Sequence, residues 1–112
     1  MNKVQHDYLK AKAAYQAARE AMSPYDEKAN AADAAENFGL ACDIMEEAYR
    51  VTGYHRASKA LTKARKALLL YVRDALQGDP HWAAIAPVFE TESLFWEDKA
   101  ADVCVNLNLG DE

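Results

Sequence analysis

Arg50 and His55 are the two residues whose types and spacing could support catalysis in this chain of 112 residues. An imidazole can transfer a proton near neutral pH, and a guanidinium can hold a phosphate. In such a site His55 would be the proton-transfer residue and Arg50 the phosphate clamp. No other catalytic motif accompanies them: the sequence contains no P-loop, HExxH or GxSxG pattern, and no histidine follows a glutamate by three positions. The sequence therefore predicts no cofactor and no metal site.

The spacing Arg50-x4-His55 resembles the motif of HEPN-type ribonucleases, which are also small and all-helical. The resemblance implies RNA cleavage, and it covers these two side chains only. The chain departs from the family pattern in two ways. Val51 follows Arg50 where the family usually has a polar residue, and Gly53 is expected to interrupt the helix that should present both groups. We keep a ribonuclease as an alternative and favour a helix-terminal arginine beside a turn histidine.

The segment before this pair has apolar residues at helical spacing. From residue 1 to 22 they alternate at intervals of three and four, which marks one face of a helix. Ser23, Pro24 and Asp26 then match an N-cap, a first helical position and a capping acid, so a new helix is predicted to begin at Pro24. The same spacing continues through Ala32, which leaves one long kinked helix as an alternative. The first face consists of Val4, Tyr8, Ala11, Tyr15, Ala18 and Met22.

The second predicted helix runs from Pro24 to about Thr52 and ends at Gly53, since glycine favours the left-handed backbone of a helix C-terminus. Two apolar faces indicate a central helix with neighbours on two sides. The clearer face contains Ala35, Phe38, Cys42, Met45 and Tyr49, and the other contains Leu40, Ile44, Ala48 and Val51.

The third predicted helix, from about Tyr54 to Gln77, has the strongest periodicity in the chain. The second predicted helix, the TGYHRA turn and the start of this helix together resemble one tetratricopeptide hairpin. No second copy follows at the 34-residue period, so the resemblance implies an antiparallel helix pair and no solenoid. The core stripe of the third helix consists of Tyr54, Ala57, Leu61, Ala64, Leu68, Tyr71 and Ala75.

Two shorter helices are predicted after Gly78. The first carries Trp82 and Phe89, and the second runs from about Glu92 to Asn106, although alternation in the last residues leaves a terminal strand as an alternative. The sequence therefore predicts an all-α fold, a small helical bundle with three long helices and a short C-terminal helix pair. Residues 1–112 are expected to form a single domain.

The positive charge of the chain is concentrated in one segment. The formal net charge is −5, yet residues 50–73 carry seven cations and no acid, while net charges of −6 and −8 fall on residues 21–49 and 74–112. The cations follow the core stripe of the third helix with an offset of two residues, which at about 100° per residue turns them roughly 200° away from the core. This basic stripe consists of Arg56, Lys59, Lys63, Lys66, Leu70 and Arg73.

The basic stripe has two interpretations, a solvated face or a surface for an anionic partner. Like charges three and four positions apart destabilise a helix by about 0.2–0.5 kcal/mol per pair, so the stripe carries a cost. An acidic partner protein, or an acidic block of a second copy in a homodimer, suits it best. Direct nucleic-acid binding stays an alternative, because the two acidic blocks would repel a polyanion and few aromatic residues alternate with the cations.

Acidic residues are also ordered. The second predicted helix has an outward stripe at Asp26, Asp33, Glu36, Asp43 and Glu47. Near the C-terminus, acids surround aromatic residues and could enter the basic groove of a nucleic-acid-handling protein, although aromatics that close the bundle explain the same pattern. The candidate residues there are Glu92, Phe95, Trp96, Glu97 and Asp98.

These features predict a non-enzymatic protein that binds and blocks a larger protein, as a small inhibitor or antitoxin-like factor. Small phage or mobile-element inhibitors, including anti-CRISPR proteins, are often compact, acidic and charge-segregated, and the chain resembles them at that level only. Cys42 and Cys104 are too far apart for a CxxC motif, which indicates free thiols in a reducing compartment. Because no apolar run approaches the ~20 residues of a membrane span and no signal-peptide core is present, we expect a cytoplasmic protein without membrane contact.

Overall fold

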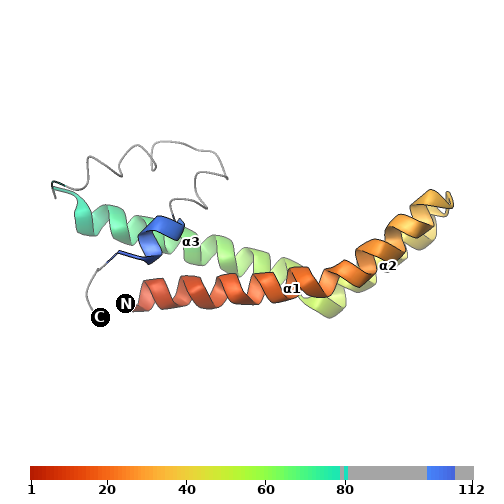
Figure 1. Cartoon of the computed structure of the whole chain (residues 1–112), viewed down its shortest axis with the longest axis horizontal. Helices are drawn as coiled ribbons and strands as arrows, with labels where there is room; N and C mark the ends of the chain where they lie inside the picture. Colours follow the sequence, from red (N-terminus) through yellow and green to blue (C-terminus); the bar gives the residue numbers. More distant parts are fainter. Residues whose placement is uncertain (79, 81–100, 108–112) are drawn as a thin grey trace. The chain divides into compact units, whose positions relative to one another are not determined.

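The computed structural model describes residues 1–78, 80 and 101–107, and these residues form an all-α fold (Figure 1). Helix α1 spans Lys3–Ala34, α2 spans Phe38–Thr52 and α3 spans Tyr54–Leu76, and residues 101–105 form a short helix. The predicted small helical bundle with three long helices is confirmed. The predicted helix around Trp82 and the first part of the last predicted helix lie outside the described residues.

The chain divides into two compact units. The terminal unit comprises Met1–Ala11 and Leu61–Glu112, and the central unit comprises Lys12–Ala60. Helices α1 and α3 each contribute residues to both units, whereas α2 lies wholly in the central unit.

Helix α1 is continuous through Pro24, so the predicted helix start at that proline is wrong. The physical reason is its apolar face, which stays in register on both sides of the proline and is buried at Met22, Ala29 and Ala32. One proline removes a single backbone hydrogen bond, and burial along this face offsets that loss.

The chain leaves α1 twelve residues later than predicted, through a C-terminal capping motif. Glu36 adopts the left-handed conformation at φ 60°, and the N–H groups of Asn37 and Glu36 donate to the carbonyls of Ala32 and Asp33. This is a Schellman arrangement with a glutamate at the position that glycine usually occupies. Asn37 then caps α2, because its side-chain oxygen accepts a hydrogen bond from the N–H of Leu40.

Helix α2 is not buried along the clearer of its two predicted faces. Its buried residues are Ala41 and Ala48, whereas Phe38 is 62% exposed and Cys42 is also exposed. Two alanines allow close packing within the central unit, and the larger residues beside them are left at the edge of that contact. The second predicted face is buried at Ala48 and half-buried at Ile44, whereas Leu40 on the same face is 48% exposed.

Gly53 ends α2 as predicted, with φ 68° in the left-handed region that glycine adopts without strain. The adjoining hydroxyl of Thr52 donates to the carbonyl of Ala48 at 2.7 Å and accepts from the N–H of Tyr54 at 3.3 Å. Helix α3 therefore begins one residue after Gly53, and its bounds agree with the prediction to within one residue.

The core of the terminal unit contains residues from α1, α3 and the short C-terminal helix, which lie together in Figure 1. The terminal strand considered for residues 103–107 is wrong, because the neighbouring residues Cys104 and Val105 are both helical and buried. The buried members of this core are Tyr8, Leu68, Val72, Ala101, Cys104 and Val105.

No helix among the described residues is both long enough and apolar enough to span a bilayer.

Candidate functional site

The predicted basic stripe forms an exposed surface along α3. We call it the basic face of α3, and all six of its residues are exposed. Leu68 and Val72 turn the opposite side of the helix into the core of the terminal unit, which fixes the basic face outward. The basic face consists of Arg56, Lys59, Lys63, Lys66, Leu70 and Arg73.

Most cations of the basic face have no acidic partner among the residues that the structure describes. Arg73 is the exception, with its Nε 3.6 Å from Oδ1 of Asp74, in a pair that is exposed on both sides and so contributes little to stability. Within the described chain Arg56, Lys59, Lys63 and Lys66 make no ion pair. Their mutual repulsion is therefore not offset by acids among the described residues.

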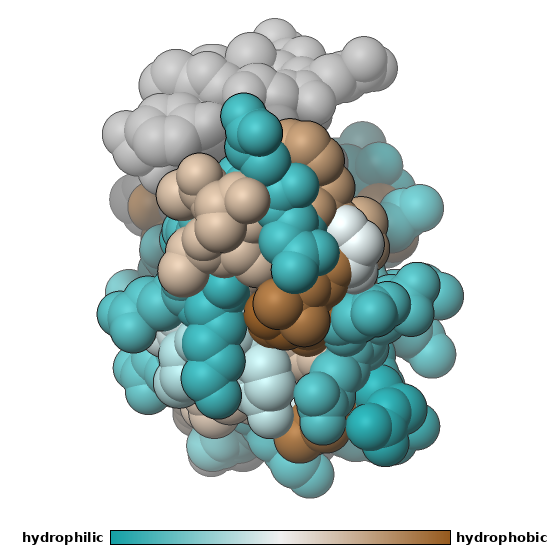
Figure 2. Space-filling model, turned by 90° about the vertical axis from the view of Figure 1, so that its right-hand side faces the viewer, coloured by the Kyte–Doolittle hydropathy of each residue, from teal (hydrophilic) through white to brown (hydrophobic). Residues whose placement is uncertain are grey.

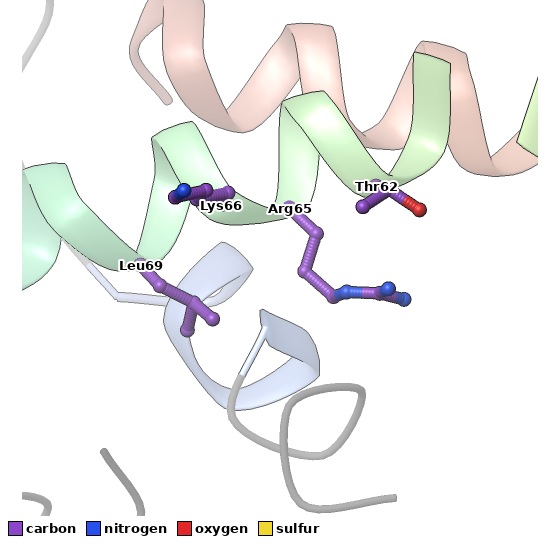
Figure 3. A pocket seen from close by; sticks show the side chains of 4 residues that line it. All are labelled: Thr62, Arg65, Lys66 and Leu69. Carbon is purple, nitrogen blue, oxygen red and sulfur yellow. The ribbon is translucent and has the colours of Figure 1, made fainter. Parts of the chain in front are cut away.

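A concavity lies next to the basic face, within the terminal unit (Figure 3). Its volume is about 190 Å³, and Thr62, Arg65, Lys66 and Leu69 line it. Arg65 extends from α3 on the same side as Thr62, and Leu69 points toward the short C-terminal helix. A guanidinium, an ammonium and a hydroxyl around one concavity are groups that can receive a carboxylate or a phosphate.

Arg65 was not among the predicted site residues, and it is only 9% exposed. In the sequence it is one of six cations between residues 55 and 76 and lies outside the 3,4 spacing of the stripe. Arg65 lies four residues after Leu61 and three before Leu68, which places it on the side of α3 that faces the core. This helical spacing is the signal that could have predicted its burial.

The structure separates Arg50 from His55 by a helix boundary. Arg50 lies in the last turn of α2, where its Nη2 is 3.9 Å from Oε1 of Glu47, and His55 lies in the first turn of α3. The predicted interruption at Gly53 is confirmed. The ring of His55 packs on the ring of Tyr49, with the two centroids 4.2 Å apart.

Three tyrosines surround the turn between α2 and α3. The hydroxyls of Tyr15 and Tyr54 are hydrogen-bonded at 3.3 Å, and the ring centroids of Tyr49 and Tyr54 are 6.0 Å apart. The hydrogen bond with Tyr15 is the larger cause, and burial the next, of a Tyr54 pKa that is raised above its ordinary value. The cluster stabilises the turn and holds a phenol in its protonated form, which does not make it a general base.

Metal chemistry has no support in the described part of the chain, where no three His, Cys, Asp or Glu side chains come together. Cys42 and Cys104 are both free, and burial raises the pKa of the Cys104 thiol to about 11. A buried thiol with a raised pKa is a poor nucleophile and a poor metal ligand.

The remaining predicted surfaces are divided between described and undescribed residues. The acidic stripe is exposed on α1 and α2, including Asp43 and Glu47. The acidic and aromatic residues near the C-terminus lie outside the described residues; these are Glu92, Phe95, Trp96, Glu97 and Asp98.

No protein-family model, no curated protein and no solved structure matches this chain.

Proposed function

We propose that this protein is a non-enzymatic binding protein, of the small-inhibitor or antitoxin kind, that docks through the basic face of α3 onto an acidic surface of a larger protein. One observation carries the proposal: four cations of one helix face are exposed and lack an ion pair within the described chain. Such a face is destabilising by itself, and a complementary anionic surface would relieve the repulsion.

The basic face would act in two ways. Its charges would accelerate association and disfavour partners of the wrong sign, and this effect weakens as salt is added. Short-range affinity would come from Leu70, which is 39% exposed. Blockade would then be steric, because a docked domain of 112 residues covers the acidic surface that it binds.

We propose the reducing cytoplasm as the place of this function, since both cysteines are free. The overall negative charge favours a protein partner over nucleic acid, because a polyanion would meet the acidic blocks that flank the basic face.

Quantitative affinity capture from extracts of the cells that express the protein tests the proposal. Three baits are compared: the wild type, a basic-face variant with Lys59, Lys63 and Lys66 replaced by Glu, and a control variant with Lys3, Lys10 and Lys28 replaced by Glu. All six lysines are exposed and both variants change the net charge equally, so a general charge effect would appear in both.

We expect a specific partner to be enriched on the wild type and the control and to fall at least about tenfold on the basic-face variant, since each lost charge contact weakens binding. Circular dichroism must show that all three baits remain equally helical. Equal capture of every partner by the two variants would mean that the basic face is a solvated surface.

A further inference from the structure

Helix α2 carries an apolar strip that is partly exposed to solvent in the described chain. Leu40 and Val51 are 48% and 56% exposed, and Ile44 between them is half-buried. With 100° per residue, the three side chains fall within about 40° of one another around the helix. Figure 2 shows one face of the molecule, where hydrophobic residues lie among hydrophilic ones.

Acidic side chains border this strip. Asp43 and Glu47 follow Leu40 by three and seven positions, so they lie on the same side of α2, and both are exposed. Glu47 is paired only loosely with Arg50, at 3.9 Å and in solvent. We call the five residues Leu40, Asp43, Ile44, Glu47 and Val51 the acidic face of α2.

The basic face of α3 has the complementary chemistry. Lys63 and Lys66 are exposed cations on a helix surface that also presents a leucine, Leu70. On α2 acids lie beside leucine and valine, and on α3 lysines lie beside leucine. The two faces are therefore opposite in charge and each contains apolar side chains.

We propose that the acidic face of α2 binds the basic face of α3 in a second copy of this chain. The inference rests on the proposed function, in which the basic face is a binding surface, and names one acidic surface that this face fits. A second copy is the favoured occupant because the required charge, apolar content and helical form are all present on the chain itself. Each copy carries both faces, so every junction uses the same pair of surfaces.

The contact is expected to be weak and salt-sensitive. It contains few apolar side chains and several exposed charges, which is typical of transient association. Self-association would also occupy the basic face and therefore compete with capture of the larger partner.

A charge-exchange experiment tests this pairing by sedimentation equilibrium at several protein concentrations, in low and in high salt. Variant X carries Asp43→Lys and Glu47→Lys, so both of its faces are basic. Variant Y carries Lys63→Glu and Lys66→Glu, so the part of its basic face at residues 63–66 becomes acidic. We expect the wild type to self-associate in low salt, and X alone and Y alone to lose association by at least about tenfold.

Mixing X and Y in equal amounts should restore association to near the wild-type level. In the mixture each acidic face meets a basic one at both junctions, which is impossible in either pure variant. Restoration also demonstrates that X and Y are folded. Matched controls are Glu20→Lys with Glu27→Lys, and Lys10→Glu with Lys28→Glu, on exposed positions of α1 that should leave association unchanged.

The outcomes separate this inference from the proposed function. A wild type that stays monomeric at every concentration in low salt, or a mixture of X and Y that does not associate, overturns the pairing while capture of a larger partner by the basic face stands. Conversely, if Y loses self-association but captures the larger partner as well as the wild type does, the pairing is upheld and the proposed function fails.

Discussion

The side-chain nitrogen Nε2 of Gln5 donates a hydrogen bond to the backbone oxygen of Leu107 at a distance of 2.7 Å. The same nitrogen also lies 3.1 and 3.2 Å from the carbonyl oxygens of Cys104 and Val105, at the end of the short C-terminal helix. Its Oε1 accepts from the N–H of Asn2, and the side-chain oxygen of Asn2 accepts from the N–H of Gln5, which is a reciprocal cap on α1. One buried side chain thus completes the hydrogen bonding of two helix ends.

Replacement of Gln5 by Glu should destabilise the protein by about 2–3 kcal/mol at neutral pH, because a carboxylate cannot donate and would face three buried carbonyl oxygens. Protonation restores one O–H donor, so the folded-state pKa of the new carboxyl should be raised and the loss should shrink as the pH falls below it. Urea unfolding at neutral and acidic pH measures this. Gln16→Glu, on an exposed position of α1, is the matched control, and an equal effect of both changes would remove the assigned role of Gln5.

Replacement of Pro24 by Ala should stabilise the protein by about 1–3 kcal/mol. Pro24 lies inside α1 and is exposed, so alanine would restore one backbone N–H, remove the ring's clash with the preceding turn and leave the core unchanged. Thermal unfolding followed by circular dichroism provides the measurement.

The same substitution discriminates between a continuous helix and a helix that begins at Pro24. At a first helical position proline is favourable, so there Pro24→Ala would be neutral or destabilising. Asn30→Ala, at another exposed position of α1, controls for helix propensity and should contribute no more than several tenths of a kcal/mol.

Helical faces could be predicted from the sequence because burial follows the 3.6-residue period. Tyr8, Ala18 and Met22 are all buried as the spacing of the first segment indicates, and Gly53 ends α2 as predicted. The end of α1 could not be predicted in this way, because Glu36 adopts a conformation that sequence patterns associate with glycine.

Part of the basic face of α3 could also be predicted, because exposure follows the helical period. Lys63 and Lys66 are exposed because they lie opposite an apolar stripe on one helix, which is local information. The role of Gln5 depends on residues 104–107, which are distant in sequence. Asn2 and Gln5 do match the spacing of a capping box, a signal that could have located the start of α1 but not its contact with Leu107.

Removal of the Tyr15 hydroxyl should lower the pKa of Tyr54. The hydrogen bond between the two hydroxyls is the main cause of the raised pKa, and the charge of Arg19 acts in the opposite direction. Tyr15→Phe should therefore move the pKa of Tyr54 back toward about 10, whereas Arg19→Gln should raise it further. Alkaline titration followed by ultraviolet absorbance, with Tyr54→Phe as the reference for assignment, measures both changes.

The raised pKa of Tyr54 also has a consequence for stability. Because the folded state holds this proton more tightly than the unfolded state does, the contribution of Tyr54 is complete below about pH 10 and is lost as the pH rises through the folded-state pKa. The alkaline loss of stability should be smaller in Tyr15→Phe than in the wild type. A Tyr54 pKa that is the same in Tyr15→Phe and Arg19→Gln would contradict the assigned hydrogen bond.

The two cysteines should differ widely in reactivity. Cys42 is exposed, whereas Cys104 is buried in the core of the terminal unit, where burial raises its pKa from 9.0 to about 11. Since the thiolate is the reacting form, the raised pKa alone reduces the reactive fraction of Cys104 about a hundredfold near pH 8, and steric burial reduces its rate further. A thiol reagent should label one equivalent rapidly in the native protein and the second only after unfolding. Cys42→Ala should abolish the rapid phase without a change in stability.

The raised pKa of Cys104 also determines how the stability of the protein changes at alkaline pH. The folded state retains the Cys104 proton up to about pH 11, while the unfolded thiol loses it near pH 9, so stability from this group is complete below pH 9 and falls between pH 9 and about 11. Cys104→Ala should flatten that part of the profile relative to the wild type, at a cost of about 1 kcal/mol at neutral pH from the lost sulfur contacts. Denaturant unfolding of both proteins across this range measures the difference. Equal labelling rates for both thiols in the native wild type would show instead that residues 101–107 leave Cys104 open to solvent.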